Sequence, residues 1–171
     1  MRAAAQRLDQ LSGLLDRIAL WIALLSVASL VLIAGWQAAA RYLLDQPPAW
    51  TEEVARYMMV WAGLMGASCA FRAHADPTLF PAARARTGRI GAGFALLRSL
   101  GTILFVIPVL WYCAVGLNGR IASGYIARNA RQMAETVDVP MSAFALAIPV
   151  GFGLILVHAL AHLATAFASS R

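Results

Sequence analysis

The chain has 171 residues, of which 61% are hydrophobic and 13% are charged, and its mean hydropathy is +0.69. This composition is too apolar for a soluble domain of that size and predicts a membrane protein. All fourteen basic residues are arginines, and the formal net charge is +6. We interpret this charge as a signal of membrane topology and expect no nucleic-acid partner.

Four windows without a charged residue set the predicted fold. They are 18–40, 57–71, 99–119 and 139–170. A spanning helix needs about 20 apolar residues. The second window is shorter, but Pro47 and Pro48 end the loop before it, so a helix from Trp50 to Phe71 is long enough to cross. The sequence therefore predicts one all-α membrane domain, residues 1–171, with four transmembrane helices. Their expected bounds are about 18–40, 50–71, 99–119 and 139–163.

Two further segments are predicted to lie on the membrane surface. In residues 1–17, apolar side chains recur at helical spacing while charged ones occupy other faces, which is typical of an interfacial amphipathic helix. The central segment 76–98 contains Pro77 and Pro81, followed by arginines among alanines and glycines. We expect this segment to form a surface helix or ordered loop that contacts anionic membrane lipid.

The arginines also predict the orientation of the chain. Nine lie on one side of the four spans and five on the other. The richer side holds Arg2, Arg7, Arg17, Arg72, Arg84, Arg86, Arg89, Arg98 and Arg171. Because loops rich in arginine stay in the cytoplasm, we expect both termini and the central loop to be cytoplasmic.

A charged and aromatic cluster stands at the entrance of the second span. Arg56 lies four residues after Glu52 and three after Glu53, so it can pair with either carboxylate. Trp50 precedes them, and Arg41, just beyond the first span, lies on the same external side. Such a network would clamp the first two helices together, or clamp the chain to a neighbouring subunit. Direct contact with a ligand and compensation of the helix dipole by the glutamates are the alternatives.

Small residues repeat at four-residue intervals on two of the predicted helices. They are Ala62, Gly66 and Ala70 on the second span, and Ala143, Ala147 and Gly151 on the fourth. Because small side chains let backbones approach closely, we interpret both stripes as helix-packing faces. At the cytoplasmic end of the second span, Arg72 and His74 are the polar residues.

The cluster at the second span is part of a longer pattern that continues to the head of the last span. Its residues are Arg41-Tyr42, Trp50-Thr51-Glu52-Glu53-Val54-Ala55-Arg56-Tyr57, Trp61, Gly66, Arg72-Ala73-His74, Asp138-Val139-Pro140 and Ala147-Ile148-Pro149-Val150-Gly151. In order and spacing, this pattern resembles the small integral-membrane subunit of tripartite ATP-independent periplasmic (TRAP) transporters.

The resemblance implies a four-helix subunit of the bacterial inner membrane. Such a subunit joins a large multi-span permease subunit and works with a periplasmic substrate-binding protein. The substrate and sodium sites would lie in the large subunit, so no cofactor is expected here. The residues agree independently, because no acidic residue lies between the helix ends, where a lone carrier usually needs one. We therefore predict the small subunit of an ion-driven uptake system for an organic acid anion.

Three histidines support the alternative hypothesis. His158 and His162 share a face near the cytoplasmic end of the fourth span, and His74 ends the second span on the same side. A bis-histidine haem there would make the chain a cytochrome b-type membrane anchor, although polar packing is the commoner role for such histidines. We expect neither an enzyme nor a metal site, because the sequence has no HExxH motif, no paired aspartates within a span and no serine with a positioned histidine.

Overall fold

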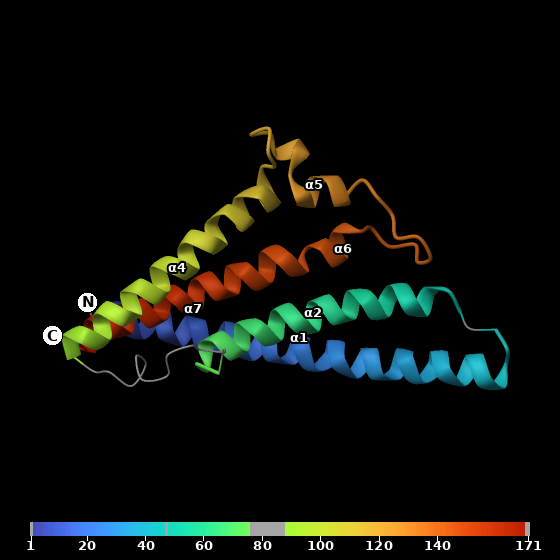
Figure 1. The fold of residues 1–171 in the computed structure, drawn as a ribbon, viewed down its shortest axis with the longest axis horizontal. Helices are drawn as coiled ribbons and strands as arrows, with labels where there is room; N and C mark the ends of the chain where they lie inside the picture. Colours follow the sequence, from blue (N-terminus) through green and yellow to red (C-terminus); the bar gives the residue numbers. More distant parts are fainter. Residues whose placement is uncertain (1, 47, 76–87, 170–171) are drawn as a thin grey trace.

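The computed structural model describes residues 2–46, 48–75 and 88–169, in which four long helices dominate (Figure 1). These helices are α1 (Arg2–Leu43), α2 (Trp50–Arg72), α4 (Gly88–Ala114) and α7 (Ala147–Ser169). Three short helices lie between α4 and α7, namely η1 (Ile121–Ser123), α5 (Tyr125–Asn129) and α6 (Ser142–Ala145). Four helical stretches are long and apolar enough to cross a membrane, which confirms an all-helical fold with four candidate spans.

The N-terminal region does not form a separate surface helix. Residues 2–17 are the first turns of α1, which continues without interruption to Leu43. The physical reason is that no proline falls anywhere in this stretch, which is rich in the strong helix formers alanine and leucine. A helix of 42 residues is about 63 Å long, roughly twice the thickness of the hydrocarbon core. α1 therefore extends well beyond the apolar part of the membrane.

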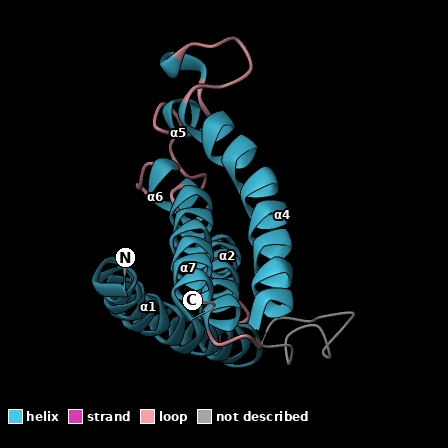
Figure 2. Ribbon diagram, turned by 90° about the vertical axis from the view of Figure 1, so that its left-hand side faces the viewer, coloured by secondary structure: helices cyan, strands magenta, loops and turns pink. Residues whose placement is uncertain are grey.

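Helices α1, α2 and α7 pack against one another, whereas α4 packs along α7 and leans away from the other two (Figures 1 and 2). The core lies where α1 meets α2, and it is formed by Ala19, Ala23 and Met65. Trp61 of α2 and Leu154 of α7 pack against this core. Because lipid tails are as apolar as these side chains, close packing rather than exclusion of water stabilises the bundle.

The small-residue stripes have mixed outcomes. Gly151 lies against α2, since a Cβ atom added there would come within 2.9 Å of the Cβ of Leu64, and Ala147 is completely buried. In contrast, Ala143 is exposed and a Cβ on Gly66 would meet open space. The other two members of the first stripe are half-buried. Close packing within the chain therefore involves Gly151 and Ala147, and the packing role of Ala143 and Gly66 stays a prediction.

Helix α4 is displaced from the predicted third span at both ends. It begins at Gly88, so residues 88–98 of the predicted surface segment are its first turns, while residues 76–87 lie outside the described part of the chain. It ends at Ala114 rather than at residue 119. Gly116 and Gly119 have φ values of 69° and 67°, a left-handed conformation that ends helices and suits glycine.

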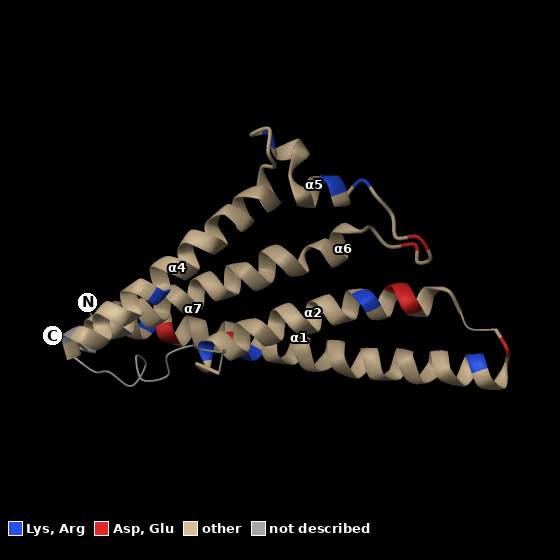
Figure 3. Ribbon diagram, in the orientation of Figure 1, with Lys and Arg blue, Asp and Glu red and all other residues tan. Residues whose placement is uncertain are grey.

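The fourth span is divided near its start. α6 ends at Ala145 and α7 begins at Ala147, two residues before Pro149. Proline has no backbone N–H, so it cannot donate a hydrogen bond to the carbonyl of the preceding turn, and it is tolerated best where a helix begins. Long stretches of the helices carry no charged residue, namely 18–40 of α1, 57–71 of α2, 99–114 of α4 and all of α7 (Figure 3).

Candidate functional site

Glu53 joins the start of α2 to the loop that precedes α6. Its side chain is only 7% exposed. One carboxylate oxygen accepts hydrogen bonds from the Tyr57 hydroxyl at 3.0 Å and from the Glu135 backbone N–H at 2.9 Å. The other accepts hydrogen bonds from the Thr136 backbone N–H at 2.7 Å and from the Thr136 hydroxyl. Four donors around one carboxylate hold this loop on the end of α2.

The loop that Glu53 binds is a small hairpin, and the helix that follows it makes an aromatic contact with α2. Met133 and Pro140 face each other across an isolated antiparallel bridge. The Tyr57 ring stacks on Phe144 of α6, with ring centroids 3.9 Å apart and planes 8° from parallel. Stacked rings and the hydrogen bonds of Glu53 therefore act together, and they tie α2 to the hairpin and to α6.

The predicted partner of Glu53 is wrong. In the described part of the chain, no ion pair joins Arg56 to either glutamate, and the Arg56 side chain is exposed. The loop donors already surround the carboxylate of Glu53, so the arginine is not needed to satisfy it. Arg41 and Trp50 are also exposed, and the described residues offer Arg41 no ion pair. The predicted arginine clamp between the first two helices is therefore not formed within this chain.

One side-chain hydrogen bond joins α1 to α2 at this end, and a second one fixes the loop between them. The Gln37 side-chain amide of α1 donates a hydrogen bond to Glu52 of α2 at 3.2 Å. The hydroxyl of Thr51, which is fully buried, donates a hydrogen bond to the Pro48 carbonyl at 2.6 Å and so fixes the loop between the helices. Glu52 thus does link the first two helices, but through an amide rather than an arginine.

A second polar cluster joins three helices at the end of the molecule where both termini lie (Figures 1 and 3). Arg72 of α2 donates a hydrogen bond to Ser12 of α1, and it pairs with Asp9 at 3.3 Å and with Asp16 at 4.0 Å. Ser12 in turn lies 2.6 Å from Nδ1 of His158 on α7. Because Arg72 donates to the serine oxygen, the hydroxyl proton is available for the histidine nitrogen.

The place of Arg72 depends on a glycine. A Cβ atom on Gly13 would lie 3.0 Å from the Arg72 guanidinium, so the absence of a side chain there lets the arginine reach across α1. Ser12 and His158 are both completely buried. The cluster therefore fixes the mutual register of α1, α2 and α7 at this end, while Glu53 fixes the other end of α2.

Comparison with known proteins identifies the family. Residues 30–169 match the family model of the tripartite ATP-independent periplasmic transporters, DctQ component. The chain belongs to this family. Over 84 residues it is also 30% identical to the sialic acid TRAP transporter small permease protein SiaQ of Vibrio cholerae serotype O1, an alignment that covers 46% of this chain and 49% of that protein. The chain thus spans about half the length of the curated relative it matches.

The DctQ family is non-enzymatic, which confirms the prediction that this chain is not an enzyme. Sequence reasoning named Glu53 and Arg72 but missed their partners. For Arg72 a signal was present, because Asp9, Ser12 and Asp16 are three and four residues apart and therefore share one face of a helix.

The histidines of this DctQ-family chain do not have the geometry of a haem site. The rings of His74 and His162 contact each other in a tilted arrangement, with centroids 4.1 Å apart and planes 36° from parallel, so no porphyrin passes between them. His158 lies one turn from His162 on the same helix and is engaged by Ser12. Arg98 of α4 lies 3.3 Å from Nδ1 of His74. Among the described residues, Nε2 of His158 and Nε2 of His162 have no hydrogen-bond partner, so polar packing accounts for these rings only in part. The ring geometry does not support the cytochrome alternative.

Proposed function

We propose that this chain is the small membrane subunit of a secondary transporter that imports an organic acid anion across the bacterial inner membrane. Its partners would be a large multi-span permease subunit and a periplasmic substrate-binding protein. Membership of the DctQ family supports this assembly. The relative from Vibrio cholerae is named for sialic acid, itself an organic acid, which supports the substrate class. The coupling sodium ions would bind in the large subunit.

One observation carries this proposal. The described spans contain no aspartate, glutamate, lysine or arginine between residues 18 and 40 of α1, 57 and 71 of α2, or 99 and 114 of α4, and none in α7. Ionisable side chains within a membrane mark the path of ions and charged substrates, because their burial is costly without such a role. Apart from His158 and His162 of α7, these stretches lack such charged side chains, so the chain is suited to support a transporter rather than to carry a charged solute by itself.

Reconstitution tests the division of labour. Proteoliposomes that contain this chain alone should take up no labelled organic acid. Vesicles with the chain, the large subunit and the binding protein should show uptake that requires an inward sodium gradient. Vesicles with the large subunit and the binding protein alone provide the control for the contribution of this chain. Uptake by the chain alone, or full uptake without it, would contradict the proposal.

We also propose that both termini are cytoplasmic. The bias of nine arginines against five supports this orientation. Cysteine labelling tests it in a variant whose native Cys69 and Cys113 are replaced by serine. In intact cells with a permeable outer membrane, an impermeant maleimide should label Gln46→Cys, between α1 and α2, and should not label Arg7→Cys. Labelling of Arg7→Cys alone would show the opposite orientation.

A further inference from the structure

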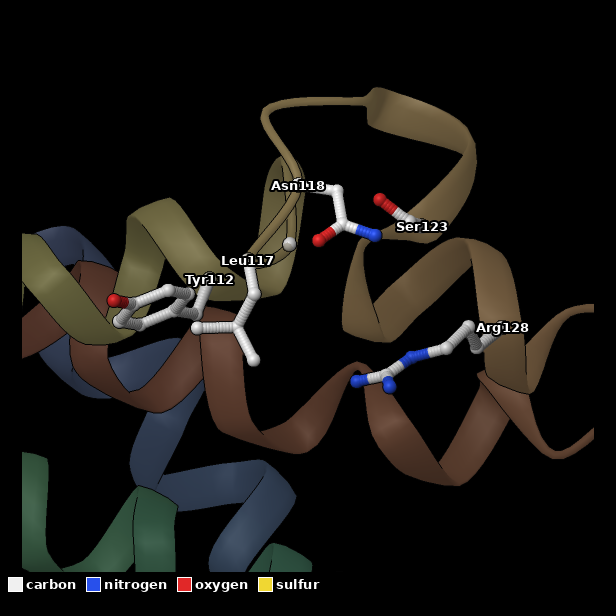
Figure 4. Close-up of a pocket in the computed structure, with 6 residues that line it drawn as sticks. Tyr112, Leu117, Asn118, Ser123 and Arg128 are labelled. Atoms are coloured by element: carbon white, nitrogen blue, oxygen red, sulfur yellow. The ribbon is translucent and has the colours of Figure 1, made fainter.

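A pocket of about 510 Å³ opens where the chain turns from the end of α4 into α5 (Figure 4). Its lining residues are Tyr112, Gly116, Leu117, Asn118, Ser123 and Arg128. It lies at the C-terminal end of α4, and neither the Glu53 cluster nor the Arg72 cluster contributes a residue to it.

The walls of this pocket are built by a tightly folded turn. A Cβ atom on Gly116 would collide with the Ser123 carbonyl, and one on Gly124 would collide with the Ala114 carbonyl. The Ser123 hydroxyl donates a hydrogen bond to the Arg120 carbonyl at 2.8 Å, which closes the turn further. Only glycine permits these approaches, so the shape of the pocket is determined by the sequence.

The charge in the pocket is positive and uncompensated. Arg128 is exposed, and within the described residues its guanidinium has neither an ion-pair partner nor a hydrogen bond. Figure 4 shows this guanidinium extending from α5 toward Leu117, with the Asn118 amide on the connecting loop. No acidic residue lines the pocket. A guanidinium and an amide can both donate hydrogen bonds to an anion with several oxygens.

The depth of the pocket indicates the source of that anion. The uncharged stretch of α4 from residue 99 to 114 rises about 24 Å, close to the hydrocarbon thickness of about 30 Å, so the pocket lies near the lipid headgroups. Large apolar side chains are exposed along α4, including Leu104 at 77% and, directly before the lining residue Tyr112, Trp111 at 58%. Leu117 itself is 84% exposed. A ligand at this depth meets a cation and an apolar helix face together.

We propose that this pocket binds the phosphate of a membrane glycerophospholipid. Arg128 and Asn118 would donate hydrogen bonds to the phosphate oxygens, and Tyr112 and Leu117 would cover the glycerol and the first part of an acyl chain. The site follows from the chain lying in a bilayer and does not depend on the transported substrate. Apolar exposure alone does not select a headgroup, so the charge of Arg128 is the decisive feature.

The full chain is incorporated into nanodiscs of phosphatidylglycerol and phosphatidylethanolamine. Native mass spectrometry of the chain released from these nanodiscs then measures how much phospholipid it retains. Arg128→Gln should lower the association constant of one retained phospholipid about tenfold, as expected for the loss of a charge-assisted hydrogen bond. Arg120→Gln removes the same charge from the neighbouring turn without lining the pocket, and it should retain lipid like the wild type. Asn118→Leu should weaken retention while leaving all arginines in place.

Two competition experiments identify the ligand. Inorganic phosphate alone should not displace the retained lipid, because it lacks the apolar part. A phosphate-free glucosyl diacylglycerol should not replace it, because it lacks the anion. Equal retention by wild type and Arg128→Gln would overturn the proposal, as would displacement by inorganic phosphate or full replacement by the glycolipid.

Discussion

Replacing Ser12 with alanine tests the polar cluster that joins three helices. The serine oxygen accepts a hydrogen bond from Arg72, and its hydroxyl lies 2.6 Å from Nδ1 of His158. Alanine removes both interactions and changes the side-chain volume very little. His158 would then be completely buried with no partner for Nδ1, whereas Arg72 would retain Asp9 at 3.3 Å. The cost should therefore come mainly from the histidine.

The expected loss of stability follows from two measured ranges. A buried polar group left without a partner costs about 1–3 kcal/mol. Hydrogen bonds between membrane helices average about 0.6 kcal/mol and reach about 1.7 kcal/mol, because the unfolded chain in the membrane also finds partners. Since Ser12 and His158 are both 0% exposed, the value should fall in the upper part of the second range. We expect Ser12→Ala to lose about 1–1.7 kcal/mol of unfolding free energy.

Unfolding in mixed micelles with increasing SDS measures this loss. Ser68→Ala is the matched control, because Ser68 is equally buried and its hydroxyl has no hydrogen-bond partner among the described residues. Removal of an unsatisfied hydroxyl should be neutral or slightly stabilising. The double variant Ser12→Ala/His158→Leu should recover much of the loss, since replacing both partners with apolar groups leaves no unsatisfied atom. If Ser12→Ala costs no more than Ser68→Ala, the cluster does not stabilise the bundle.

Two further substitutions test other contacts. Gly151→Val should lower the unfolding free energy by about 1–3 kcal/mol, because its Cβ would lie 2.9 Å from the Cβ of a leucine on α2. Gly153→Val, at a position with open space, should lose less, and equal losses would contradict the packing argument. Glu53→Gln should speed trypsin cleavage at Arg131. The glutamine amide presents an N–H group where the loop donors need an oxygen acceptor, so the loop is held less firmly. Glu52→Gln should leave the cleavage rate near that of the wild type, and similar rates in both variants would refute the role of Glu53.

The number of long helices and the bounds of the second one could be predicted because hydropathy acts locally. A span requires only enough apolar residues in a row, and the second helix begins at the predicted Trp50. Its far end lies at Arg72, one residue beyond the predicted bound. The third helix ends earlier than predicted because Gly116 takes a left-handed conformation, which depends on the tight turn that follows it. Glycines occur inside helices as well, so this one alone did not predict the boundary.

The polar partners could be predicted only where they were close in sequence. One partner of Glu53 lies 83 residues away at Thr136, and nothing in the sequence around Thr136 pointed to the start of α2. Helical spacing pointed instead to Arg56, three residues along the same helix. Such spacing shows which residues can meet on an isolated helix, but not which competing donors the folded chain provides. The contacts of Ser12 with His158, across 146 residues, were equally beyond prediction.

The choice between loop donors and an arginine at Glu53 has a physical basis. A buried pair of Glu53 and Arg56 would require both charges to leave water, and the cost of desolvating the guanidinium adds to that of the carboxylate. The backbone N–H groups of the hairpin need acceptors in any case. When they donate to the Glu53 carboxylate, the N–H groups and the carboxylate are all satisfied, and only one charge is buried. Arg56 then remains exposed, where water, lipid phosphates or a neighbouring subunit can compensate its charge. Because the hairpin donors satisfy the Glu53 carboxylate, Arg56 stays on the surface, where it can contact another molecule.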